Sequence, residues 1–171
     1  GDCSGLNAVL RAVVLTAINK YGCEVVGFRK GYAGLYANNY IKLTAENTTQ
    51  ILNQGGTILK NSNKDNLFNY AYRDENGNIQ HKDVSDVAVQ NLKDLEIDAL
   101  VVIGGDGTLT SARDFARKGV RVIGVPKTID NDLVMTDHTA GFGSAAKFVA
   151  TTMKEVLRDV SVYKMKAVTI V

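Results

Sequence analysis

Glycines, carboxylates and a lysine are concentrated in two short loops near the middle of the chain. The first loop, residues 104–108 (GGDGT), follows the apolar run 99–103, and the second, residues 126–132 (PKTIDND), follows the apolar run 120–125. Residues 109–118 between them have helical spacing. In open parallel sheets, such a strand–helix–strand unit places ligands at the carboxyl ends of its strands. These residue types at that place indicate a phosphoryl-transfer site.

The first loop combines a seat for phosphate with a ligand for a metal ion. Gly105 and Gly107 let the backbone approach an anion closely, and the following helix start supplies unpaired N–H groups and a positive dipole end. Asp106 repels phosphate unless a Mg²⁺ ion lies between them, and Mg²⁺ commonly takes one or two carboxylates plus substrate phosphates. We therefore expect Asp106 to bind the metal. The alternative is a strand–turn–helix in which Asp106 only caps the helix.

The second loop carries two carboxylates and one lysine. Asp130 and Asp132 stand two residues apart after a strand, and Lys127 precedes the first of them by three. Moving a phosphoryl group onto an alcohol requires an acceptor for the hydroxyl proton and positive charge over the transferring group. Asp130 can accept the proton and Lys127 can supply a point charge. The alternative is a loop that begins at proline and contains Asx turns.

Strands and helices alternate around these loops. We expect strands at residues 24–28, 57–59, 99–103, 120–125 and 167–171. We expect helices from residue 6 to a stop at Gly22, at 45–53 with Thr44 as cap, from Ser85, and at 109–118 and 140–159, with a turn at 31–35. This order predicts an α/β fold, a Rossmann-like three-layer sandwich whose helices cover both faces of a mainly parallel sheet.

One stretch, residues 61–83, differs in character from the rest. Phe68, Tyr70 and Tyr72 alternate with polar residues ahead of an Asn76-Gly77 turn, which predicts a surface hairpin. The alternative is disorder, because Asn, Asp and Lys dominate the stretch.

The composition sets broader limits. The 171 residues, 45% hydrophobic and 22% charged, suit one domain with a sizeable core. A net charge of +2 without a basic stripe argues against nucleic acid, and no apolar run is long enough for a membrane span. Two cysteines favour a reduced, cytoplasmic setting. Since the chain opens on a loop and stops in a strand, we expect it to be part of a longer protein.

The chain resembles the N-terminal part of the 6-phosphofructokinase family. The matching stretches occur in family order at residues 1–7, 31–35, 55–59, 104–108 and 126–132. PKTIDND is the most specific, because NAD kinases and lipid kinases also resemble GGDGT but lack the second loop. The resemblance implies a donor-binding domain of phosphofructokinase-like fold over 1–171, without its first strand and its C-terminal substrate half, and with an insertion at 61–83.

The resemblance also implies how a phosphate donor, ATP or pyrophosphate, would be bound with Mg²⁺. The implied donor-binding residues are Gly1, Gly105, Asp106, Gly107 and Thr108, with Asp106 as the metal ligand. Lys64 is the best match to a donor-binding arginine of the family. A lysine there keeps the charge but loses the bidentate fork.

Fructose 6-phosphate is the acceptor that the resemblance implies. Thr128, Ile129 and Asp130 would contact the sugar, and Asp130 would take the proton from its 1-hydroxyl. Asp132 and Lys127 would act near the transferring group. The product would be fructose 1,6-bisphosphate, a glycolytic intermediate, and the resemblance implies an allosteric homo-oligomer. A different acceptor, such as sedoheptulose 7-phosphate, stays open.

Gly107 and Lys127 indicate different donors. Pyrophosphate-dependent relatives typically have a second Asp after the metal-binding Asp and a Lys after the loop proline, whereas this chain has Gly107 with Lys127. An acidic side chain at 107 would repel the α-phosphate of a nucleotide, and glycine leaves room. We therefore favour ATP over pyrophosphate. A non-catalytic regulatory subunit is a further alternative, although we expect such a chain to lose Asp106 or Asp130.

Overall fold

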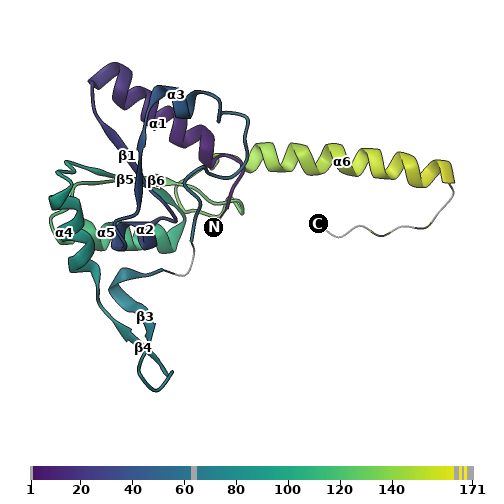
Figure 1. Cartoon of the computed structure of the whole chain (residues 1–171). Coiled ribbons are helices and arrows are strands. Elements are labelled where there is room, and N and C mark those ends of the chain that lie inside the picture. Colours follow the sequence, from purple (N-terminus) through teal and green to yellow (C-terminus); the bar gives the residue numbers. More distant parts are fainter. Residues whose placement is uncertain (1, 63–64, 164–165, 167, 169–171) are drawn as a thin grey trace.

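The computed structural model describes residues 2–62, 65–163, 166 and 168. Figure 1 shows how the elements are arranged in space. In chain order they are α1 (Leu6–Tyr21), β1 (Val25–Phe28), α2 (Tyr32–Tyr36), β2 (Tyr40–Leu43), α3 (Ala45–Thr49), η1 (Leu67–Asn69), β3 (Tyr70–Arg73), β4 (Ile79–Lys82), α4 (Ser85–Asp94), β5 (Leu100–Gly104), α5 (Asp106–Arg117), β6 (Val122–Pro126) and α6 (Phe142–Tyr163).

The described strands form three two-stranded sheets. β5 and β6 are parallel, with Leu100 opposite Val122, and α5 packs on both of them as the crossover helix. The predicted α/β class and the parallel pair that carries the two loops are therefore present. β1 and β2 pair antiparallel, as do β3 and β4. The segment 29–39 that joins β1 to β2 is shorter than the crossover of about a dozen residues or more that parallel strands require.

Several local predictions agree with the structure. Gly22 ends α1 in the left-handed conformation, with φ of 64°; its N–H donates to the Ile18 carbonyl, and the Cys23 N–H donates to the Ala17 carbonyl. Thr44 caps α3 through a capping box with Asn47. β3 and β4 form the antiparallel hairpin that the alternation within 61–83 predicts.

Other local predictions differ from the structure. The helix α2 begins at Tyr32, where a turn was expected over 31–35. The predicted strand at 57–59 is a turn, closed by a hydrogen bond from the Lys60 N–H to the Thr57 carbonyl. α3 ends at Thr49, four residues before its expected end, and β2 was not predicted. These segments are too short for periodicity to separate helix, strand and turn. The predicted strand at 167–171 falls mostly outside the described residues.

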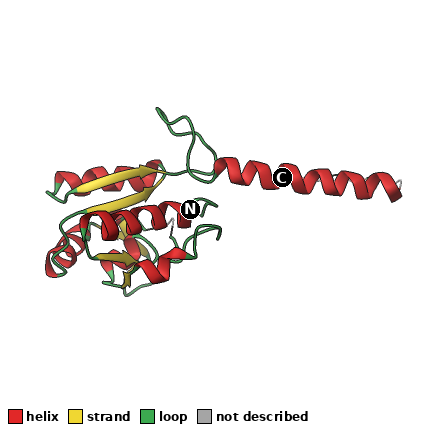
Figure 2. Cartoon of the chain, turned by 90° about the horizontal axis from the view of Figure 1, so that it is seen from above, coloured by secondary structure: helices red, strands yellow, loops and turns green. Residues whose placement is uncertain are grey.

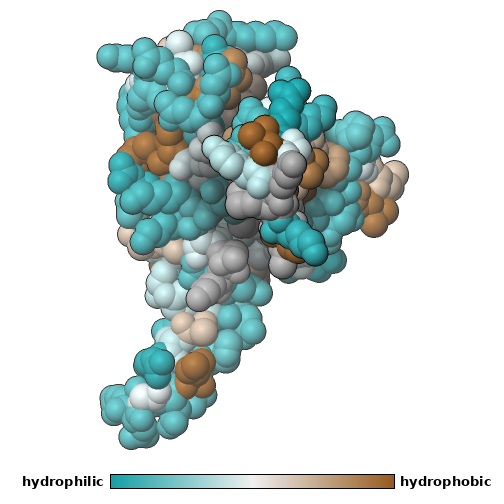
Figure 3. Space-filling model, turned by 90° about the vertical axis from the view of Figure 1, so that its right-hand side faces the viewer, coloured by the Kyte–Doolittle hydropathy of each residue, from teal (hydrophilic) through white to brown (hydrophobic). Residues whose placement is uncertain are grey.

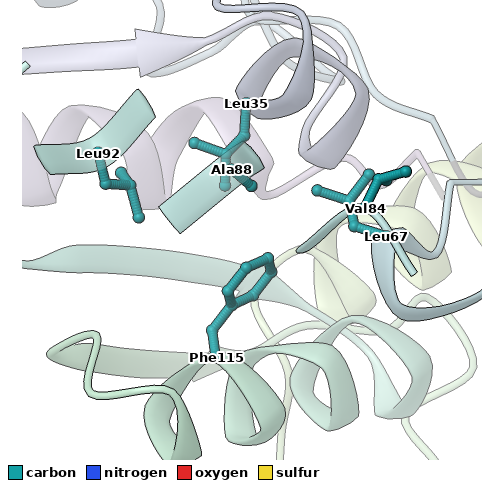
Figure 4. Close-up of a cluster of buried hydrophobic side chains, with 6 residues drawn as sticks. All are labelled: Leu35, Leu67, Val84, Ala88, Leu92 and Phe115. Carbon is teal, nitrogen blue, oxygen red and sulfur yellow. The ribbon is translucent and has the colours of Figure 1, made fainter. Parts of the chain in front are cut away.

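Two apolar cores hold these elements together. Figure 4 shows the larger core, in which α5 contributes a fully buried Phe115 opposite side chains of α2, η1 and α4; its members are Leu35, Leu67, Val84, Ala88, Leu92 and Phe115. The second core joins α1 to β2 through Leu10, Val14, Leu43 and Ile51. The ring of Phe115 lies 5.6 Å from that of Tyr32 and 4.9 Å from that of Phe68, so aromatic contacts hold α5 against α2 and η1.

Two elements extend away from these cores. Figure 2 shows α6 as a long helix projecting from one side, and none of its residues is buried; Phe148 and Leu157 are exposed apolar side chains on it. The β3–β4 hairpin projects separately, and its surface in Figure 3 is mostly hydrophilic. Ile79 in β4 is an exposed apolar side chain. Among the described helices, none is both long and apolar enough to cross a membrane.

Asn7 is a buried polar residue, only 2% exposed, that joins the start of α1 to the turn at residues 54–58. Its Nδ2 donates to the carbonyls of Gln54 (3.1 Å) and Gly55 (3.4 Å), and its Oδ1 accepts from the Ile58 N–H (2.9 Å). The side chain therefore satisfies backbone groups of a segment far away in the sequence.

Replacing Asn7 with Ala is expected to lower the free energy of unfolding by about 1–3 kcal/mol, because buried backbone groups lose their partners. Urea unfolding followed by circular dichroism measures this change. Asn19→Ala on the exposed side of the same helix is the matched control and should shift stability by less than about 0.5 kcal/mol. Equal losses for the two variants would contradict the anchoring role of Asn7.

Candidate active site

The two predicted loops follow the carboxyl ends of β5 and β6, so they lie at the same edge of this two-stranded sheet. Gly104 lies opposite Pro126, and the Lys127 N–H donates to the Gly104 carbonyl at 2.8 Å, so the pairing continues one residue into the second loop. A Cβ on Gly105 would lie 3.4 Å from the Lys127 carbonyl oxygen. The loops that the sequence predicts to act together are therefore in direct contact.

A cavity of about 410 Å³ opens where the two loops meet. Its described lining consists of Asp2, Tyr32, Ser62, Asp65, Asn66, Gly105, Asp106, Gly107, Thr108, Ser111, Lys127, Thr128, Ile129 and Asp130. Most of the predicted site residues thus line one cavity. Gly1 and Lys64, predicted to bind the donor, lie outside the described residues.

Asp132 is placed differently from the other predicted site residues. It is exposed and does not belong to the described lining of the cavity. The chain turns at Asn131, whose φ is 54°, and the next apolar side chain, Leu133, is buried. This turn separates Asp132 from Asp130, although only one residue lies between them.

The first loop is shorter than expected because α5 begins at Asp106, whereas the spacing predicts a helix start at Leu109. The N-cap residue of α5 is Gly105. Because glycine has no side chain, it makes no capping hydrogen bond to the N–H groups of the first helical turn. These N–H groups border the cavity. A helix N-terminus in this position favours a bound anion.

Tyr32 is a lining residue to which the sequence assigned no role. Its hydroxyl donates to the Thr108 carbonyl at 2.8 Å, and the ring packs on Phe115 of the larger core. Burial raises the pKa of Tyr32 well above its ordinary value, so the hydroxyl stays a neutral donor. Tyr32 therefore ties α2 to the first turn of α5. Its position within the family stretch 31–35 was the signal that could have identified it.

The described lining of the cavity is rich in acids. It contains four aspartates, Asp2, Asp65, Asp106 and Asp130. Its basic residue is Lys127, which is only 5% exposed. Such a lining repels a polyphosphate unless a divalent cation lies between them. Among the described residues, no cluster of three or more His, Cys, Asp or Glu could hold a metal by itself. The donor set therefore fits Mg²⁺ shared between one or two carboxylates and ligand phosphates.

The N-terminal segment also reaches this site, because it contacts residues 140–141 at the end of the segment that joins β6 to α6. The Cys3 thiol donates to the Ala140 carbonyl at 3.2 Å, and the Ser4 hydroxyl donates to the Gly141 carbonyl at 2.6 Å. A Cβ on Gly5 would lie 2.4 Å from the carbonyl carbon of Ala140, so this contact requires glycine. Three segments distant in sequence thus converge around the cavity.

Two glycines of the first loop have opposite surroundings, which provides a test of the loop geometry. A Cβ on Gly104 would lie 2.5 Å from the Thr108 Cβ, whereas a Cβ on Gly107 would have nothing within 4 Å. We expect Gly104→Ala to lower stability by about 1–3 kcal/mol through overpacking. Gly107→Ala should raise it by roughly 0.5–1 kcal/mol, because alanine favours the helix. Urea unfolding compares the two, and a stabilised Gly104→Ala would contradict this geometry.

Two curated proteins are similar to most of this chain. ATP-dependent 6-phosphofructokinase 2 of Clostridium perfringens is 64% identical over 153 residues, which are 90% of this chain and 42% of that protein. Pyrophosphate–fructose 6-phosphate 1-phosphotransferase of Dictyoglomus thermophilum is 43% identical over 90% of this chain and 41% of its own length. The chain therefore spans about two-fifths of the length of these curated relatives.

The solved structure of phosphofructokinase from Saccharomyces cerevisiae is also similar. It superposes with a TM-score of 0.73 at 30% identity, over 94% of this chain and 23% of that one. The α/β fold predicted from the sequence is confirmed by this likeness. The family model described as Phosphofructokinase matches residues 1–171. The chain therefore belongs to the phosphofructokinase family.

Proposed function

We propose that the protein containing this chain transfers the γ-phosphoryl group of ATP to the 1-hydroxyl of fructose 6-phosphate, giving fructose 1,6-bisphosphate in glycolysis. One observation carries the proposal: the N-terminus of α5 and the loop containing Asp130 border the same acid-rich cavity. The name of the Clostridium perfringens relative, an ATP-dependent 6-phosphofructokinase, supports this choice of donor and reaction.

The donor half of the proposed site lies at the start of α5. The first-turn N–H groups at residues 105–108 bind the phosphates of ATP, and the helix dipole favours their negative charge. Asp106 holds the Mg²⁺ ion, which supplies charge neutralisation for the phosphates. Gly1 and Lys64 are further proposed donor contacts on the strength of the family resemblance.

The acceptor half lies on the loop after β6. Thr128 and Ile129 contact fructose 6-phosphate, and Asp130 accepts the proton from its 1-hydroxyl as the oxygen attacks phosphorus. The Asp130 N–H donates to the Thr128 hydroxyl at 3.2 Å, which supports the local turn that presents the carboxylate. Lys127 contributes positive charge beside the transferring group, and Asp132 acts near it. We expect the protein to act in the cytoplasm as a homo-oligomer.

Gly107 is the proposed determinant of the donor. Because the space around it is open, an acidic side chain there would place negative charge where the α-phosphate of ATP lies. We expect Gly107→Asp to lower kcat/KM for ATP by about 10-fold or more, since like charges at a binding site cost several kcal/mol. Gly107→Ala adds the Cβ without the charge and should retain most ATP use.

Steady-state rates of the whole protein with ATP and with pyrophosphate measure this preference. The Dictyoglomus thermophilum relative is named for pyrophosphate, so pyrophosphate is the second candidate donor. Faster turnover of the unmodified protein with pyrophosphate than with ATP would show that ATP is the wrong donor.

Asp130 provides a test of the reaction itself. Replacing it with Asn keeps the shape but removes the proton acceptor, so kcat should fall by about 10²-fold or more while the KM values change little. Asp137→Asn is the matched control, because Asp137 is exposed on the same loop and takes part in its hydrogen bonds through its backbone carbonyl. Near-normal turnover of Asp130→Asn would remove Asp130 from the role of base.

A further inference from the structure

The loop between β6 and α6 is closed by the side chain of a single asparagine. The Oδ1 atom of Asn131 accepts a hydrogen bond from the Thr139 N–H at 2.9 Å, and its Nδ2 donates to the Asp137 carbonyl at 3.1 Å. Its φ of 54° is left-handed, a conformation that Asn adopts more readily than most residues other than glycine. The side chain therefore ties two parts of the loop together at the point where the chain turns.

Thr139 completes this closure from the other side. Its side chain is buried, and its hydroxyl donates to the carbonyl of Thr128, which lines the cavity. The next residue, Ala140, is held by the Cys3 thiol and by close packing against Gly5. Thr139 thus links the beginning of the loop to an end that is already fixed on the N-terminal segment.

The tip of the loop between these two anchors is open to solvent. Val134 and Met135 are almost fully exposed, and Met135 has a φ of 61°. Residues 127–141 contain no helix or strand in the structure, so no backbone ladder fixes Asp130. Its position depends on side-chain bonds such as those of Asn131 and Thr139.

We propose that Asn131 and Thr139 are positioning residues, which together hold Asp130 toward the donor loop in the geometry needed for transfer. They do not touch the reacting atoms and act through the backbone of residues 128–131. We call the hydrogen bonds of Asn131 and Thr139 the clamp. Its expected effect on turnover rests on the proposed function, whereas its expected effect on the structure of the loop does not. A small displacement of the base affects turnover more than binding, because transfer requires close alignment.

The kinetic test uses the whole protein and three threonine variants. Thr139→Val keeps the shape but removes the hydroxyl, and kcat should fall by about 10- to 100-fold with the KM for ATP changed by less than about threefold. Thr139→Ser restores the hydroxyl and should return kcat to within about threefold of the unmodified protein. Thr151→Val is the matched control, because it removes a hydroxyl-to-carbonyl bond on exposed α6.

The structural test is hydrogen exchange at the Thr139 amide in the protein without substrates. Asn131→Gly tolerates the left-handed backbone but removes both side-chain bonds, so the amide should lose its protection. Asn131→Asp retains an oxygen that accepts from this amide and should keep most of the protection. Circular dichroism verifies that both variants are folded.

Either of two results would overturn the proposal: unchanged protection of Thr139 in Asn131→Gly, or full turnover of Thr139→Val. Equal loss of turnover in Thr139→Val and Thr139→Ser would also contradict it, since the hydroxyl would then not be the operative group. If the unmodified protein does not phosphorylate fructose 6-phosphate with either donor, the proposed function fails. The exchange experiment still decides whether the clamp exists.

Discussion

The register of β5 and β6 is the constraint on which the rest of the site depends. With Gly104 opposite Pro126, both strands end at the same level, and the Lys127 N–H continues the pairing onto the Gly104 carbonyl. A slip of one residue would turn each side chain to the opposite face and separate the two loops. α5 holds this arrangement because its buried Phe115 packs into the larger core while its N-terminus borders the cavity.

Backbone contacts, rather than long side chains, bring the three segments of the site together. The Cβ of any larger residue at Gly5 would collide with the backbone of Ala140, and one at Gly105 would lie 3.4 Å from the Lys127 carbonyl oxygen. Small residues at these points let the N-terminal segment, the start of α5 and the loop after β6 approach closely. Rigid placement of this kind is what catalytic geometry requires, because displacements of about 1 Å can cost orders of magnitude in rate.

The charges of the cavity impose a second condition. The base that we propose for the sugar hydroxyl and the seat that we propose for phosphates have opposite electrostatic needs, and Asp130 and Asp106, the residues proposed for these roles, line one cavity. The helix N-terminus and the mostly buried Lys127 supply positive potential, and Mg²⁺ would supply the remainder. This balance would let carboxylates lie beside phosphates in the proposed site.

The sequence by itself determined the features that depend on neighbouring residues. These include the end of α1 at Gly22, the cap of α3 at Thr44, the strands before each loop, and the chemical character of the loops. The tertiary structure alone decided that Tyr32 joins the two predicted loops around one cavity, that Asp132 lies outside the described lining, and that β1 pairs with β2. Caps and periodicity are local and can be read along the chain, whereas burial and the lining of a cavity depend on contacts between residues far apart in the sequence, which no local pattern reveals.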